Sequence, residues 1–260
     1  MSKSTTENST EQSRQQYVVK ANDLIRKTRY SLTAQQQKIV LFCISKIRPG
    51  DTPDTEYEIS VDELCRACNL EVDNGGYYYK TIKEDIMKLT ARLWIRMPDA
   101  TEKTVSWISD ATMSPYSGTI RFTFHKAMVP YLFDLRDHYT QYHLEDVLVF
   151  HGKHAIRLYE VLRSYTTQEA IEKGWRKACE FSLEELRDIL AVNNSYPCWA
   201  DFERYVIRKA VDEINRCSDE ICVEYEPVRN GKTVTNVRFV IHMPDARQRL
   251  EAYREKRRRM

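Results

Sequence analysis

The stretch from Cys179 to His242 constrains the fold more than any other part of the chain. Ser182, followed three residues later by Glu185, has the spacing of a capping box, which predicts that a short helix begins there. A longer helix is predicted over residues 199–217, because apolar side chains recur there at helical spacing. These apolar positions are Phe202, Val206, Ile207, Ala210, Val211 and Ile214. This stripe can bury against the first helix.

The opposite face of the longer helix is predicted to be cationic. When residues are placed at about 100° steps around the helix, this face also contains Asp201, Asp212 and Asn215, which interrupt its positive charge without neutralising it. Its cationic and aromatic members are Arg204, Tyr205, Arg208, Lys209 and Arg216. The first two arginines are one turn apart, so both can point into one groove and pair with guanine. The alternative is that they form surface ion pairs with Asp201, Asp212 or Glu213, worth at most ~1 kcal/mol each.

An alternating segment follows the longer helix. Apolar residues alternate over residues 221–225 and again over 234–241, on either side of Asn230-Gly231, a dipeptide typical of hairpin turns. Helix, helix and hairpin in this order are typical of a winged helix-turn-helix. The second helix of such a motif enters the DNA major groove. We expect Arg229 and Lys232, in the hairpin or wing, to lie along the phosphates.

The first half of the chain repeats this order of elements. Ser60 and Glu63 have the same capping spacing about 120 residues earlier, and a helix is predicted over residues 77–89. Strands over residues 93–97 and 105–111 are predicted to form the matching hairpin. We therefore predict an α+β fold of two tandem winged helix-turn-helix domains related by internal duplication. The expected boundaries are a disordered tail at 1–16, domains at 17–137 and 138–244, and a basic tail at 245–260.

The helix predicted over residues 77–89 has a cationic face of a different kind. Lys80, Lys83 and Lys88 lie on its polar side. Its apolar face consists of Ile82, Ile86 and Leu89. Lysine is a point charge that suits phosphate contact better than planar recognition of a base. We expect these lysines to bind the DNA backbone and to add salt-dependent affinity.

Overall composition does not by itself indicate a nucleic-acid partner. The chain has 40 basic and 38 acidic residues and a formal net charge of +2, so only the local placement of charge is informative. The basic run after Pro244 is more often a solvated helix or tail than a specific site. Seven cysteines without framework spacing predict reduced thiols and a cytoplasmic location. No segment approaches the roughly 18 apolar residues of a membrane span.

Signatures of catalysis are weak in this sequence. Cys65 and Cys68 form a lone C-x-x-C without a second pair, which favours buried cysteines over a zinc site. His151 and His154 have no carboxylate in the same stretch. Neither a Walker-type phosphate loop nor a dinucleotide fingerprint occurs. We expect no enzymatic activity, no metal and no cofactor; the enzymatic alternative is a nicking initiator with a nucleophilic tyrosine and metal-binding histidines.

Several short strings carry a resemblance to a known family. They are Tyr139–Tyr142, Ala155–Glu160, Asp201–Tyr205 and Asp212–Asn215, together with Tyr17–Leu24 near the start. In their order and spacing, the chain resembles the iteron-plasmid replication initiators, a family that includes the F-factor initiator. The resemblance extends from Tyr17 to about Pro244.

The resemblance implies a protein that binds directly repeated origin sequences, called iterons, as a monomer. It also implies a homodimer that binds an inverted repeat at its own promoter and represses it, with residues 105–111 of the first domain as the candidate interface. The implied partners are double-stranded DNA and the host replication initiator and helicase proteins. A dedicated winged-helix transcriptional repressor is the alternative within DNA binding.

The family pattern also implies a base-reading arginine at or beside Arg204. This sequence departs from that pattern, because Glu203, Arg204 and Tyr205 stand where the F-factor initiator has three consecutive basic residues. The departure leaves the fold prediction intact but leaves the individual base contacts open.

Overall fold

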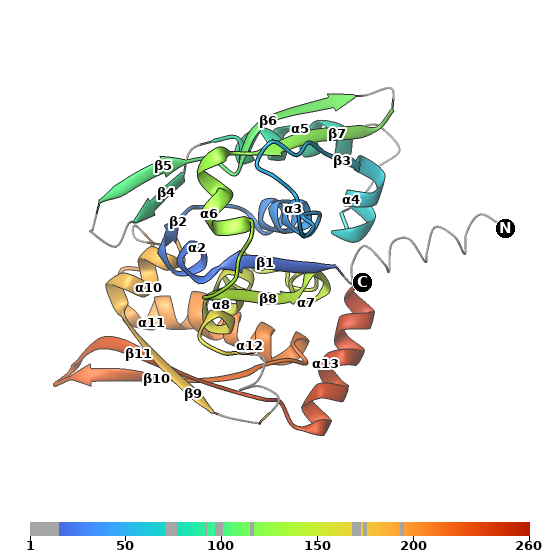
Figure 1. Cartoon of the computed structure of the whole chain (residues 1–260). Coiled ribbons are helices and arrows are strands. Elements are labelled where there is room, and N and C mark those ends of the chain that lie inside the picture. The colour runs from blue at the N-terminus through green and yellow to red at the C-terminus, as the bar shows by residue number, and fades with distance from the viewer. Residues whose placement is uncertain are drawn as a thin grey trace. The chain divides into compact units, whose positions relative to one another are not determined.

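The computed structural model of the chain describes residues 16–70, 77–91, 93–96, 101–114, 117–167, 173, 176–192 and 195–260. These residues form two compact units (Figure 1). Unit 1 comprises Met1–Leu24 and Gln35–Leu148, and unit 2 comprises Ile25–Ala34 and Val149–Met260. The tail expected at residues 1–16 lies outside the described residues, apart from Gln16.

Unit 1 is built on a three-stranded antiparallel sheet in the order β3-β7-β6. Its strands are β1 (Tyr17–Ala21), β3 (Tyr57–Ser60), β4 (Leu93–Arg96), β5 (Glu102–Val105), β6 (Ile108–Ser114), β7 (Thr119–Phe124) and β8 (Tyr139–His143). Its helices are α3 (Ala34–Ile44), α4 (Val61–Ala67), α5 (Tyr77–Leu89), the 3-10 turn η1 (Lys126–Met128), α6 (Val129–Leu132) and α7 (Leu144–Leu148). Ile120, Phe122 and Phe124 alternate along β7 and are all buried, so one face of this sheet forms the core.

Unit 2 repeats this plan with a three-stranded antiparallel sheet in the order β9-β11-β10. Its elements are the end of α2 (Asn22–Lys27), β2 (Thr28–Arg29), α8 (Lys153–Ser164), β9 (Lys177–Ser182), α10 (Leu183–Ile189), α11 (Trp199–Phe202), the π-helical segment η2 (Glu203–Ile207), α12 (Arg208–Cys217), β10 (Cys222–Asn230), β11 (Thr233–His242) and α13 (Ala246–Arg259). In each three-stranded sheet the first strand pairs with the last strand of the hairpin, β3 with β7 and β9 with β11, as in a winged helix.

The two capping boxes predicted from the sequence coincide with helix starts. The Ser60 hydroxyl accepts a hydrogen bond from the Glu63 N–H at 3.4 Å, and the Ser182 hydroxyl accepts one from the Glu185 N–H at 3.1 Å. Each bond satisfies a backbone donor that has no partner inside the first turn. The internal repeat predicted from this spacing is therefore present in the local structure.

The prediction of the hairpin in unit 1 was wrong. The hairpin that pairs with β3 is β6–β7, whereas β4 and β5 pair with each other. Residues 105–111 are not one strand, because Ser106 and Trp107 separate β5 from β6. The Trp107 N–H donates to the Leu89 carbonyl at 3.2 Å, and its carbonyl accepts from the His125 N–H at 3.1 Å. Burial of the Trp107 side chain, 1% exposed, accompanies this break.

The units also divide differently from the expected domains at 17–137 and 138–244. Residues 139–148 lie in unit 1, where β8 pairs antiparallel with β1 from Tyr17↔His143 to Ala21↔Tyr139. Residues 25–34 lie in unit 2, where Arg157 Nη2 donates to the Thr28 carbonyl at 2.9 Å. Both differences come from pairings between segments far apart in sequence, which local patterns do not report.

Residues 246–259, expected as part of a basic tail, form helix α13. Asp245 caps this helix through a complete capping box with Gln248. The helix packs against α12, and Arg259 Nη1 lies 2.8 Å from Glu213 Oε1, each side chain being only 11% exposed. The C-terminal segment is therefore an integral part of unit 2.

Glu213 joins three elements of unit 2. Besides Arg259, its carboxylate accepts hydrogen bonds from the backbone N–H groups of His151 at 2.8 Å and Gly152 at 3.0 Å, at the start of α8. Gly152 allows this approach, because a Cβ there would lie 2.8 Å from Glu213 Oε2. A carboxylate at a helix N-terminus is also favoured by the helix dipole. None of the described helices is long and apolar enough to cross a membrane.

We expect Glu213→Ala to lower the free energy of unfolding by about 3 kcal/mol, because it leaves two backbone N–H groups without their acceptor and removes one of the two carboxylates that pair with Arg259. Urea denaturation of the full chain measures this loss. Asp212→Ala, an exposed position on the same helix, is the control and should change stability by no more than about 0.5 kcal/mol. Equal, small losses in both variants would contradict the role given to Glu213.

Candidate nucleic-acid interface

The helix predicted to read DNA runs without a break over residues 199–217, but its middle is π-helical. Segment η2 covers Glu203–Ile207, and the Arg208 N–H donates to the Glu203 carbonyl, a spacing of five residues instead of the α-helical four. The predicted apolar stripe of this helix is confirmed, because all six of its residues are buried. Short π-helical segments inside α-helices occur frequently at functional sites.

The π-helical segment brings the side chains of Glu203 and Arg208 together. Arg208 Nε lies 2.9 Å from Glu203 Oε1, and Arg208 Nη2 lies 2.8 Å from each carboxylate oxygen. In a regular α-helix, residues three or four apart are neighbours, whereas residues five apart diverge. The wider turn of the π-helix therefore creates this ion pair.

Tyr225, on β10, completes the cluster by donating its hydroxyl hydrogen to Glu203 Oε1. Burial, followed by the hydrogen bond to Glu203, raises the pKa of Tyr225 to about 12. Burial also raises the pKa of Glu203, but the hydrogen bonds from Tyr225 and Arg208 outweigh it and hold that pKa below its ordinary value. Glu203 is therefore ionised at neutral pH and fixes the orientation of Arg208.

The ion-pair alternative considered for the two arginines applies to Arg208, although its partner is Glu203 and not one of the three acids named from the sequence. The Arg208 side chain is 56% exposed, and exposed pairs of this kind contribute at most ~1 kcal/mol. DNA can therefore compete for this guanidinium at small cost. Glu213, one of the three expected acids, binds Arg259 instead.

Arg204 lies one turn before Arg208 and has a different environment. Its guanidinium carbon lies 5.4 Å from the ring centroid of Tyr205, and Lys209 Nζ lies 5.5 Å from the same centroid. Tyr205 is 40% exposed and stacks on Tyr196, with 5.9 Å between ring centroids. Within the described part of the chain, Arg204 has no carboxylate partner. The structure thus places two predicted site residues, Arg204 and Lys209, beside the ring of a third, Tyr205.

The tip of hairpin β10–β11 carries the two predicted wing residues. Asn230 pairs with Thr233, so the turn consists of Gly231 and Lys232, and Gly231 adopts a φ of +61° that glycine accommodates without strain. Arg229 Nη1 donates to the Lys232 carbonyl at 3.2 Å, and both side chains are exposed. Neither residue has a carboxylate partner among the described residues.

Other exposed arginines of this sheet are paired with carboxylates. Arg238 lies 3.1 Å from Glu180 and 3.3 Å from Glu226, and Arg176 lies 2.7 Å from Glu224. Among the described residues, Arg204 and the two wing-tip residues thus lack the carboxylate partners that Arg238 and Arg176 have.

Helix α5 of unit 1 presents its lysines as the sequence predicted. Lys80, Lys83 and Lys88 are exposed, and the opposite face is buried. Asp85 anchors this helix to α3 by accepting hydrogen bonds from Gln35 Nε2 at 2.6 Å and Gln36 Nε2 at 2.8 Å. Lys80 lies 4.0 Å from Glu84 in an exposed pair, which neutralises it only weakly.

The residues weighed for metal binding have other environments. Cys65 and Cys68 are buried in unit 1, and burial is the main cause that lowers the pKa of His154 to about 4. Among the described residues, no group of three or more His, Cys, Asp or Glu side chains is arranged to hold a metal ion.

Comparison with family models identifies both units. A model described as "Initiator Replication protein, WH1" matches residues 17–163, and one described as "Initiator Rep protein, WH2" matches residues 182–241. The chain belongs to the initiator replication protein family. The resemblance inferred from the sequence strings is therefore confirmed.

Individual relatives agree with this family assignment. A curated Escherichia coli protein described as a replication initiation protein is 28% identical over 208 residues, which cover 78% of this chain and 63% of the relative. The chain thus spans less than two thirds of the length of that relative. A crystal structure described as the Pi initiator protein in complex with iteron DNA matches with a TM-score of 0.72 and 16% identity, covering 89% of this chain and 99% of that one. At this identity the match shows the shared fold.

The sequence does not reveal the contact between Glu203 and Tyr225. The family pattern marks Glu203 only as a departure, and the alternation of apolar residues places residue 225 only in the hairpin. No sequence signal for their contact existed, because residues five apart do not meet in the α-helix that the pattern predicted.

Titration of Tyr225 tests this cluster. Its folded pKa of about 12 lies above the ordinary value of 10, so its contribution to stability is complete below pH 10 and is lost as the pH rises from 10 to 12. The difference in tyrosinate absorbance between the wild type and Tyr225→Phe should show one group that titrates near pH 12. Glu203→Gln should lower that midpoint, because it removes the charged acceptor. A midpoint near 10 in the wild type would contradict the assigned hydrogen bond.

Proposed function

We propose that this chain is a plasmid DNA replication initiator that binds repeated origin sequences as a monomer and represses its own promoter as a dimer. One observation supports it most directly: in a chain of the initiator family, the winged helix of unit 2 displays cationic side chains on its long helix and at its wing tip, and these have no carboxylate partner within the described ranges. Such groups can release the counterions of DNA without first breaking an ion pair.

Arg204 is the residue that we propose to read a base. It is exposed, has no carboxylate partner among the described residues, and projects from the N-terminal half of the helix, where winged-helix proteins contact base edges. Tyr205 and Lys209 lie next to it and are proposed to contact the same DNA segment. Arg208 is proposed to join them by exchanging its bond to Glu203 for a bond to DNA.

The remaining predicted residues are proposed to bind phosphates. Arg229 and Lys232 are placed at the end of the wing, where a backbone contact fixes the orientation of the domain without reading sequence. Lys80, Lys83 and Lys88 are proposed to do the same from unit 1. Two binding units on one chain raise affinity through effective concentration.

Arg204→Ala should weaken binding to an iteron duplex by about 1–3 kcal/mol while leaving binding to a random duplex nearly unchanged. Lys83→Gln should weaken binding to both the iteron and the random duplex. It should also make the slope of log K against the logarithm of salt concentration less steep by ~0.9, the value for one lost phosphate contact. Arg216→Ala is the control for Arg204, because Arg216 lies on the same helix but pairs with Glu255 at 3.9 Å. Fluorescence anisotropy over a salt series gives all these quantities. Equal losses for Arg204→Ala on both duplexes would refute base reading.

We also propose a homodimer, contacts with host replication initiator and helicase proteins, and a cytoplasmic location. The edge position of β6 in its sheet supports the homodimer, because an edge strand has backbone groups that can form hydrogen bonds with a second copy. Free thiols at all seven cysteines support the cytoplasmic location. Footprints on direct repeats and on an inverted promoter repeat, read against protein concentration, test the monomer and dimer assignments.

A plasmid whose only origin consists of the candidate repeats tests the proposed function as a whole. We expect it to be maintained when the full chain is supplied from elsewhere, and to be lost when the supplied chain carries Arg204→Ala. Repression of the promoter without plasmid maintenance would instead assign the chain as a dedicated repressor. DNA strand cleavage by the purified chain with Mg²⁺ or Mn²⁺ would instead assign it as a nicking initiator.

A further inference from the structure

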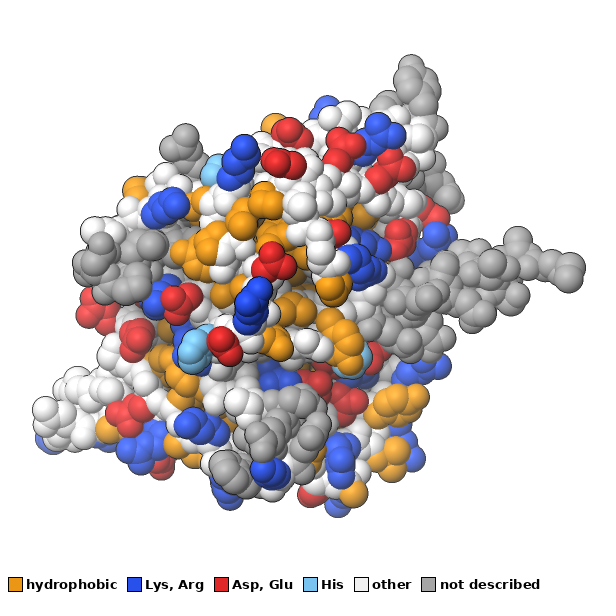
Figure 2. Space-filling model, viewed as in Figure 1, with side chains coloured by type: hydrophobic (Ala, Val, Ile, Leu, Met, Phe, Trp, Pro, Cys, Tyr) orange, Lys and Arg blue, Asp and Glu red, His pale blue; other side chains and the backbone are white. Residues whose placement is uncertain are grey.

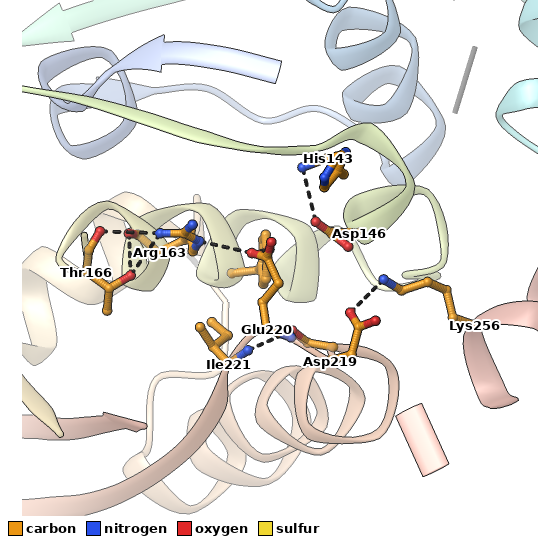
Figure 3. Close-up of polar contacts among 10 residues, drawn as sticks. His143, Asp146, Arg163, Thr166, Asp219, Glu220, Ile221 and Lys256 are labelled. Atoms are coloured by element: carbon orange, nitrogen blue, oxygen red, sulfur yellow. Dashed lines mark hydrogen bonds and ion pairs between the residues drawn. The ribbon is translucent and has the colours of Figure 1, made fainter. Parts of the chain in front are cut away.

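Helix α13 is fixed to unit 2 by one face. Ala252 and Lys256 are buried on that face, and Lys256 Nζ lies 2.7 Å from Asp219 Oδ1 (Figure 3). Arg259 reaches Glu213 on the same side. These contacts determine which side chains of α13 point away from the unit.

The outward face of α13 is apolar as well as cationic. Leu250, Tyr253, Arg254 and Arg257 follow the spacing i, i+3, i+4 and i+7, which places them on one stripe of a helix, and all four are exposed. Leu250 is 50% exposed and Tyr253 is 53% exposed. We call these four residues the α13 stripe. Figure 2 shows apolar side chains beside Lys and Arg side chains in this region.

Charge on α13 is strongly unbalanced. The helix has seven basic and two acidic residues. Glu251 pairs with Arg247 at 2.9 Å, and Glu255 is occupied by Arg258 at 2.7 Å and Arg259 at 2.8 Å. Among the described residues, Arg254 has no carboxylate partner. A surface of this charge attracts an acidic partner.

The position of α13 separates it from the groups proposed to bind DNA. It lies at the opposite end of unit 2 from the tip of hairpin β10–β11 (Figure 1). The stripe therefore stays accessible when the wing and the N-terminal half of the long helix contact a duplex. Exposed leucine and tyrosine beside arginine favour a protein over a phosphate backbone, because tyrosine and arginine are enriched in the energetic centres of protein interfaces, whereas phosphate contacts require no apolar group.

We propose that the α13 stripe docks an acidic, partly apolar segment of a second protein. The apolar centre, Leu250 and Tyr253, contacts an apolar side chain of that segment, Arg254 pairs with one of its carboxylates, and Arg257 adds positive charge to the same stripe. One helix stripe is smaller than the roughly 800 Å² per partner of a standard interface, so binding is weak and transient. The proposal does not depend on the function proposed above.

The test begins with a photoreactive benzophenone amino acid in place of Tyr253 in the full chain, irradiated in bacterial cells. We expect a covalent adduct with a second protein through a segment rich in Asp and Glu that contains an apolar residue. That segment, prepared as a peptide, should bind the purified chain. Arg254→Glu should weaken this binding by about tenfold or more, and exchanging a carboxylate of the peptide for lysine should restore it.

Arg249→Glu is the matched control, because it changes the charge of α13 equally at an exposed position about 100° around the helix from Leu250, outside the stripe. It should leave peptide binding unchanged, and both variants should bind random duplex DNA like the wild type, which also shows that they fold. Four outcomes would overturn the proposal: an adduct with DNA only, an adduct with a second copy of this chain only, no adduct, or equal weakening of peptide binding by both variants.

Discussion

Burial of one face of the helix over residues 199–217 is the constraint on which unit 2 depends. Phe202, Val206 and Ile214 are fully buried, each contributing about 1.5–3 kcal/mol relative to exposure. Because these side chains face the core, the side chains on the opposite face of the helix must face solvent. The same apolar pattern that stabilises the unit therefore also determines that Arg204, Tyr205 and Lys209 are displayed.

Carboxylates then determine which displayed cations are available. Glu203 holds Arg208, Glu255 lies near Arg216, and Glu180 and Glu226 hold Arg238. The groups left without a carboxylate partner among the described residues include Arg204 and the two wing-tip residues. In a chain with nearly equal numbers of acidic and basic residues, this pairing, and not the net charge, creates the candidate interface.

The two units share a plan but differ in what they display. Both have a serine-capped helix, a second helix and a sheet in which the first strand pairs with the last. Unit 1 presents lysines on α5 and has an additional pair of strands, β4 and β5, before its hairpin. Unit 2 presents an arginine beside an aromatic ring and continues into α13. Because arginine can form two planar bonds to one base and lysine cannot, a division between base reading and phosphate contact follows from these residue types.

The sequence by itself determined the local elements: the serine caps, the apolar stripe, the turn at Asn230-Gly231 and hence the repeated winged-helix plan. These depend on interactions between residues close together in the chain, which composition and spacing report directly. Tertiary structure alone decided that β8 pairs with β1 and that Trp107 divides the predicted strand. It also decided that the basic C-terminal segment is a helix packed against unit 2. A π-helical turn, which the sequence does not show, brings Glu203 into contact with Arg208 and Tyr225. Each of these depends on partners distant in sequence or on a helical pitch that the spacing of apolar residues does not encode.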